Sequence, residues 1–272
     1  PFDPLLRFLK GGDIVVANLE GSFTNFPSTT INNYKGALSF TFDPRIASEL
    51  KKIGFTLFSK ANNHTLNFGR EGLRQSRETI VSSGLDWFGD PSNKDIQSYT
   101  TTIRGQKITF VGYHEFAHQG LDTVLNDIKV AKEGGSFVVV YPHWGEEYKK
   151  LANKTQVDTA HAFIDSGADL ILGSHPHVVQ DIEIYKGKAI FYSLGNFIFD
   201  QYWNEHVQTG LGVAVSAHED SITYTLIPFT TKDMRNQPAL MDAESARVLI
   251  ERVFASIDAP ESITISRFEG SP

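Results

Sequence analysis

Short apolar runs recur along the chain, and segments with the spacing of amphipathic helices separate many of them. Strands are expected at 13–17, 55–59, 99–103, 107–113, 137–141, 169–172, 178–185, 188–193, 212–216 and 222–228. Helices are expected at 43–53, 69–83, 121–133, 155–166 and 243–255. The alternation of strands and helices over most of the chain predicts a partly parallel sheet. The later hairpins predict a second, mixed or antiparallel sheet that packs against it.

Turn and capping residues indicate where the expected helices begin and end. Asp43 is expected to cap the first helix, with Pro44 at its first position and Gly54 at its end. The second helix is expected to turn Ile80 and Val81 towards the core. The polar stretch 22–39 predicts a long surface loop, and its length favours a functional loop or a lid.

Composition narrows the class of protein. The 272 residues are 40% hydrophobic and 21% charged, which is sufficient for the core of one large domain. A net charge of −7 without a lysine or arginine block argues against nucleic-acid binding. The absence of cysteine excludes disulfides and cysteine-ligated zinc. No signal peptide and no apolar run of roughly 20 residues is visible. Because the sequence begins with Pro1, we expect a processed or excised piece of a longer protein.

Polar clusters follow several of the expected strands, where α/β folds place their sites. They are Asn18-Leu19-Glu20, Asn62-Asn63-His64, Pro142-His143 and His175-Pro176-His177. Imidazole, amide and carboxylate groups together are typical ligands of a divalent metal. Two residues apart in an extended backbone, the paired histidines are expected to face the same side. Trp144 is expected to be a buried aromatic beneath this site.

The motifs NLE, ANNHTLNFG, YPHWGEEY, GADLILGSHPHVVQ and SLGNFIFDQ, in this order, resemble the CapA-type capsule synthesis family. These poly-γ-glutamate biosynthesis proteins resemble the calcineurin-like metallophosphoesterases. The resemblance covers residues 13–199 and implies an α/β fold, a four-layer α/β/β/α sandwich with two mixed sheets. A single domain is expected over residues 1–272, with a tail at about 258–272.

The resemblance also implies roles for individual residues. Glu20 takes the place of a carboxylate that bridges two metals, and His64 matches the catalytic histidine. The remaining ligand positions fall on Asn63, His143 and His175 for one metal and on His177 for the other. Candidates for substrate binding or for shaping the site are Asn18, His114, Asn196 and His206.

Two features depart from the family pattern. Relatives begin with a strand that ends in Gly-Asp and supplies a further carboxylate ligand, and no such strand precedes residue 13. Relatives also carry an aspartate where this chain has Asn67. An asparagine there can orient His64 but adds no charge to raise its pKa.

Several functions remain open at this stage. The resemblance implies a metal-dependent hydrolase of capsule or poly-γ-glutamate biosynthesis that uses a metal-activated water and one or two ions of manganese, iron or zinc. Its partners would be an anionic polymer or a phosphorylated small substrate, together with membrane proteins of capsule assembly. The expected location is the extracytoplasmic face of the cell envelope. The alternatives are a non-catalytic polymer-binding or export component of capsule assembly, and a small-molecule phosphatase unrelated to capsule.

Overall fold

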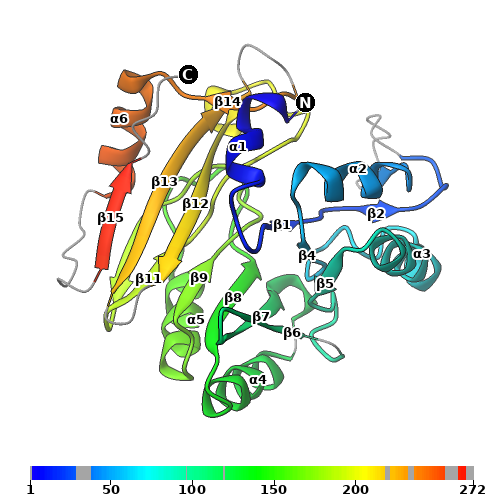
Figure 1. The fold of residues 1–272 in the computed structure, drawn as a ribbon, viewed down its shortest axis with the longest axis horizontal. Coiled ribbons are helices and arrows are strands. Elements are labelled where there is room, and N and C mark those ends of the chain that lie inside the picture. The colour runs from blue at the N-terminus through cyan, green and yellow to red at the C-terminus, as the bar shows by residue number, and fades with distance from the viewer. Residues whose placement is uncertain are drawn as a thin grey trace. The chain divides into compact units, whose positions relative to one another are not determined.

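The computed structural model describes residues 2–28, 38–95, 97–118, 120–217, 221–231, 236–254 and 263–267. The chain divides into two compact units (Figure 1). The N-terminal unit comprises Phe8–His143, and the C-terminal unit comprises Pro1–Arg7 with Trp144–Pro272. Both units combine helices with parallel and antiparallel strand pairs, so the expected α/β class is confirmed.

The N-terminal unit contains three groups of paired strands. A parallel sheet has the order β1-β4-β5, with β1 (Val16–Asn18), β4 (Leu57–Ser59) and β5 (Asp86–Phe88). In a second group, β7 (Gln106–His114) pairs with β6 (Ser98–Ile103) in antiparallel and with β8 (Phe137–His143) in parallel orientation. The short strands β2 (Ser22–Phe23) and β3 (Thr41–Phe42) also pair. The predicted hairpin at 99–113 is therefore confirmed, whereas β5 was not anticipated.

These strands are accompanied by α2 (Ile46–Ile53), α3 (Gly69–Ser82) and α4 (Leu121–Glu133), with the 3-10 turn η2 (Glu115–Ala117). The short helix α1 (Leu6–Leu9) includes the chain position at which one unit ends and the other begins. Helix α2 begins later than expected, because the Asp43 carboxylate accepts from the backbone N–H of Arg45 (2.9 Å) and caps no helix. Gly54 ends α2 as predicted, in the left-handed region (φ 117°). Ile80 is buried, but Val81 is 60% exposed, so its predicted inward orientation is wrong.

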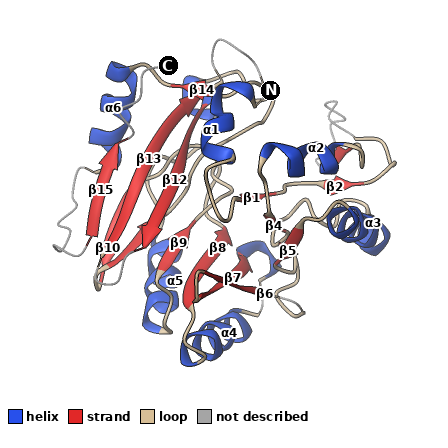
Figure 2. Cartoon of the chain, viewed as in Figure 1, coloured by secondary structure: helices blue, strands red, loops and turns tan. Residues whose placement is uncertain are grey.

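The C-terminal unit contains two groups of paired strands, which are drawn in red in Figure 2. In one, β11 (Lys188–Phe191) pairs with β9 (Leu170–Leu172) in parallel and with β10 (Ile182–Tyr185) in antiparallel orientation. In the other, the long antiparallel pair β12 (Thr209–Ala217) and β13 (Ile222–Thr230) is extended by β14 (Ala239–Leu240) and β15 (Ile263–Arg267). Strand β15 lies within the expected tail, and the tail prediction did not anticipate it.

The helices of this unit are α5 (Lys154–Asp165) and α6 (Ala243–Val253), with the 3-10 turns η1 (Asp3–Leu5) and η3 (Glu205–Gln208). Helix α5 begins with a capping box, in which Asn153 and Gln156 each accept from the other's backbone N–H. Side chains such as Phe163 and Phe191 form the buried core here. None of the helices in the described parts of the chain is long and apolar enough to cross a membrane.

The stretch 22–39 differs from its prediction at its beginning. Ser22 and Phe23 are buried and pair with β3, so the surface-loop prediction is wrong for these two residues. Residues 29–37 lie outside the described residues. The segment that follows Glu20 is therefore tied to the body of the N-terminal unit.

Candidate functional site

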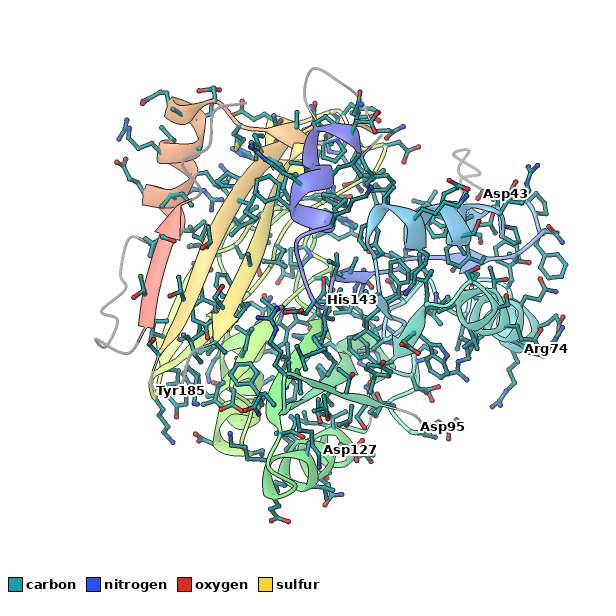
Figure 3. The ribbon with its side chains drawn as sticks, viewed as in Figure 1. Asp43, Arg74, Asp95, Asp127, His143 and Tyr185 are labelled. Atoms are coloured by element: carbon teal, nitrogen blue, oxygen red, sulfur yellow. The ribbon has the colours of Figure 1, made fainter. Side chains whose placement is uncertain are left out.

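The polar residues of the N-terminal unit gather where its strands end. Asn18 is the last residue of β1, and the segment 60–64 follows directly after the parallel neighbour β4. His143, labelled in Figure 3, ends β8. It lies opposite His114 in the register of β7 and β8. Carboxyl ends of parallel strands thus bring these residues to one edge of each sheet, as the sequence predicted.

Glu20 lies at the centre of this cluster. Its Oε1 atom is 3.8 Å from Nε2 of His64 and 3.8 Å from Nε2 of His143. Its other oxygen, Oε2, accepts a hydrogen bond from the side-chain amide of Asn18 (3.0 Å). One carboxylate therefore approaches two imidazoles and is oriented by a neighbouring asparagine.

His143 and Asn63 meet directly. Nε2 of the buried His143 ring is 2.9 Å from Oδ1 of Asn63. On the other side of the ring, Nδ1 lies 3.5 Å from the amide nitrogen of Asn18, which can only donate. This pattern places the imidazole proton on Nε2, from where it is donated to Asn63. Both atoms are of the kinds that bind divalent metals.

The side chain of Asn67 holds the ring of His64. Oδ1 of Asn67 accepts from the backbone N–H of Phe40 (3.1 Å) and lies 2.9 Å from Nδ1 of His64. Because an amide oxygen only accepts, Nδ1 of His64 carries a proton and Nε2 is the nitrogen that faces Glu20. The ring of Phe40 packs against the imidazole, with 4.4 Å between centroids. The expected orienting role of Asn67 agrees with this geometry.

Asn62 and Lys60 belong to the hydrogen-bond network around Glu20, although the sequence pattern predicts a role for neither residue. The amide of Asn62 donates to Oδ1 of Asn18 (2.9 Å) and to the backbone oxygen of Leu19 (3.0 Å). Its own Oδ1 accepts from the backbone N–H of His64 (3.1 Å). Lys60 is fully buried, and burial lowers its pKa to about 7. No motif signals these contacts, since Asn62 also fits a simple turn.

His114 approaches the cluster as a third imidazole. Its ring lies 6.0 Å from the ring of His143, and its Nδ1 donates to the backbone oxygen of Pro91 (2.7 Å). Nε2 is buried and has no hydrogen-bond partner among the described residues. Burial lowers the pKa of His114 and so favours the neutral ring, with Nε2 free to accept.

The C-terminal unit holds the histidine pair that follows β9. His175 and His177 are buried, and their ring centroids are 5.9 Å apart. Their backbones have φ values of 101° and 60°, so the expected extended backbone is wrong. Two left-handed residues on either side of Pro176 turn the chain sharply, and this turn brings the rings together.

His177 is fixed by polar and aromatic neighbours. Its Nδ1 lies 2.9 Å from Oδ1 of Asn196, whose amide nitrogen donates to Gln201 (3.0 Å). Tyr148 stacks on the imidazole with 6.0 Å between centroids, and Phe199 packs against it at 5.0 Å. Because Asn196 occupies Nδ1, Nε2 of His177 remains available to a ligand.

Two further residues singled out from the sequence are His206 and Trp144. His206 is partly exposed and lies 3.9 Å from the Glu205 carboxylate, and partial burial lowers its pKa. Trp144 is buried as expected, and its Nε1 donates to the backbone oxygen of Tyr192 (2.8 Å).

The mixed α/β fold and these histidine, asparagine and glutamate clusters at strand ends define a class of proteins with candidate metal sites. Residues 1–201 match the family described as "Bacterial capsule synthesis protein PGA_cap", and the chain belongs to this family.

Similar proteins carry corresponding names. The chain is 35% identical over 223 residues to the PGA biosynthesis protein CapA of Bacillus subtilis, covering 74% of this chain and 56% of that protein. It is 28% identical over 261 residues to the capsule biosynthesis protein CapA of Bacillus anthracis, covering 89% and 64% respectively. The chain thus spans between about half and two thirds of the length of these relatives.

A solved structure supports the fold. A hypothetical protein from Thermus thermophilus aligns with a TM-score of 0.51 and 16% sequence identity, over 83% of this chain and 95% of that protein.

Proposed function

We propose that this chain is a metal-dependent, hydrolase-like part of the machinery of capsule or poly-γ-glutamate biosynthesis. The convergence of the Glu20 carboxylate with two histidine side chains, at 3.8 Å each, carries the proposal. Family membership supplies the biological setting.

The residues present fit a divalent cation. Glu20, Asn63 and His143 offer the oxygen and nitrogen atoms that manganese, iron and zinc accept. The ligand atom of His143, Nε2, carries a proton in the observed hydrogen-bond pattern, so binding requires that proton to leave. A bound cation would supply Lewis acidity and lower the pKa of a water molecule.

The histidine pair would complete the site. We propose that His175 and His177 also supply imidazole ligands, each residue offering one ligand atom. The number of ligands suits one or two ions. Asn196 holds Nδ1 of His177 and thereby leaves Nε2 as the ligand atom. We also propose for this chain the four-layer α/β/β/α sandwich of the metallophosphoesterases.

His64 has a different task in this proposal. Asn67 keeps a proton on Nδ1, so a protonated His64 can give the proton on Nε2 to a leaving oxygen. Asn18, His114 and His206 would shape the surroundings of the substrate. We propose an anionic polymer or a phosphorylated small molecule as substrate, membrane proteins of capsule assembly as partners, and the extracytoplasmic face of the cell envelope as location.

Metal content tests the proposal first. The wild type, His175→Ala and the control His161→Ala are dialysed against Mn²⁺, Fe²⁺ or Zn²⁺ and measured by elemental mass spectrometry. His161 is a suitable control because it is a histidine outside the proposed ligand set. Its ring stacks on Tyr185 and pairs with Glu183. We expect about one or more equivalents of metal in the wild type and the control, and loss in His175→Ala.

Hydrolytic activity is then measured on the same preparations. Phosphomonoesters, phosphodiesters and poly-γ-glutamate are offered with and without EDTA, and we expect hydrolysis that EDTA and His175→Ala abolish. A protein that stays free of metal but binds poly-γ-glutamate in EDTA would instead be the non-catalytic component of capsule assembly.

A further inference from the structure

A lysine is buried beneath the segment that carries Glu20. Lys60 follows β4 directly, and none of its surface is exposed. Its Nζ atom donates to the backbone oxygen of Leu19 (3.2 Å) and to that of Gly21. These two carbonyls lie on either side of Glu20, so one side-chain nitrogen holds the backbone before and after the carboxylate.

The environment of Lys60 is unfavourable for a charge. Desolvation is the largest influence on its pKa, and the nearby Arg77 guanidinium acts in the same direction. Glu20 opposes both by favouring the charged form. A buried amino group is retained in proteins where its hydrogen bonds fix a structure, and here it fixes the Glu20 segment.

A second set of contacts acts on the same segment. Asn62 also donates to the Leu19 carbonyl, and it orients Asn18, which in turn donates to Oε2 of Glu20. Lys60 therefore holds the backbone around Glu20 while the asparagines orient its carboxylate. Of these contacts, Lys60 alone reaches the carbonyl of Gly21.

We propose that Lys60 is a positioning residue that fixes Glu20, through the carbonyls of Leu19 and Gly21, for ligand binding. The role of Glu20 as a ligand rests on the function proposed above, whereas the clamp on its backbone does not.

Hydrogen–deuterium exchange tests the clamp without any metal. Backbone amides of Leu19, Gly21 and Ser22 are hydrogen-bonded within the unit and report on this segment. In Lys60→Met, which has no donor, we expect these amides to exchange about tenfold faster or more. Lys60→Gln, which restores a neutral donor, should recover part of the protection.

Lys107→Met is the matched control, because Lys107 also donates to a backbone oxygen, that of Gly134, but at an exposed position. It should leave the exchange of residues 18–22 unchanged. Unchanged exchange in Lys60→Met would overturn the proposal. If Lys60→Met does not fold, Lys60→Gln takes its place. Faster exchange of residues 18–22 than in the wild type then supports the clamp, because a shorter neutral donor holds the two carbonyls less well, and wild-type exchange overturns it.

Calorimetric titration with Mn²⁺ tests the consequence for Glu20. Contacts that orient a metal ligand typically contribute roughly 10- to 100-fold to affinity, so Lys60→Met should weaken binding by that factor and Lys60→Gln by less. Wild-type affinity in Lys60→Met would refute the positioning role. Absence of Mn²⁺ binding by the wild type would refute the proposed metal function, and the exchange experiment would then decide on the clamp alone.

Discussion

At the scale of single residues, side-chain amides do most of the positioning around Glu20. Asn18 orients the carboxylate, Asn62 holds Asn18, and Asn67 sets the proton of His64. The sequence predicted that these polar residues gather, because each follows a strand. It could not predict the burial of Lys60, since a lysine between Ser59 and Ala61 has no pattern that distinguishes it from a solvated one.

Replacing Asn67 with aspartate tests how His64 is tuned. The change keeps an oxygen that accepts from Phe40 and His64 but adds a negative charge beside Nδ1. A carboxylate accepts the Nδ1 proton more strongly than an amide oxygen does, so we expect Asn67→Asp to move the NMR resonance of this proton downfield. An unchanged Nδ1–H resonance of His64 would contradict the contact.

The pH dependence of stability should reveal Lys60. Burial lowers its pKa from 10.5 to about 7, so between these values the unfolded chain binds a proton that the folded chain has lost. The free energy of unfolding should therefore rise as the pH increases from about 7 towards 10.5.

Urea unfolding of the wild type and of Lys60→Met at pH 7 and pH 9 measures how much Lys60 contributes to this change in the free energy of unfolding. We expect the wild type to gain about 2 kcal/mol more than the variant between the two values. Equal changes in both proteins would show that Lys60 keeps its proton when folded.

At the scale of elements, most helices and strands were predicted because their periodicity and end signals agree. Helix α4 (Leu121–Glu133) matches its prediction at both ends, with Gly134 following it. Strand β5 was not predicted, since the three residues Asp86–Phe88 are too few to show a pattern. The turn at 175–177 was missed for another reason: left-handed backbone at histidine leaves no mark in the sequence.

Gly173, which follows β9 and precedes the turn at 175–177, is closely packed against neighbouring atoms. A Cβ atom there would lie 2.0 Å from the backbone oxygen of Tyr192 and 2.7 Å from Nε1 of Trp144. We expect Gly173→Ala to lower the free energy of unfolding by roughly 2 kcal/mol or more, because backbone must move. Urea denaturation followed by tryptophan fluorescence measures this loss.

Gly212→Ala in β12 is the control, since its Cβ would meet Ile227 at an ordinary 3.4 Å. Its effect should stay within about 0.5 kcal/mol. Equal effects of the two substitutions would contradict the close approach at Gly173.

At the scale of the whole molecule, the candidate ligands are divided between two units, with Glu20 in one and His175 in the other. The metal function proposed above makes a specific prediction about Mn²⁺, which should stabilise the wild type by about 2.7 kcal/mol at 100 times its dissociation constant. Glu20→Gln and His175→Ala should each remove most of this gain.

The double variant Glu20→Gln/His175→Ala tests whether both residues serve the proposed metal centre, in which case it should lose no more than either single variant. Chemical denaturation with and without Mn²⁺ completes the cycle. Additive losses would place the two residues at separate sites.

The left-handed backbone of His175 implies that the stability of the fold and the function of this residue oppose each other. Non-glycine residues at such φ values are disfavoured, by about 1 kcal/mol or more. His175→Gly should therefore be more stable to urea than His175→Ala by about 1 kcal/mol, although glycine normally weakens a fold relative to alanine. A chain selected for robustness alone would carry glycine at this position, and keeping an imidazole there sacrifices stability for a chemically useful group.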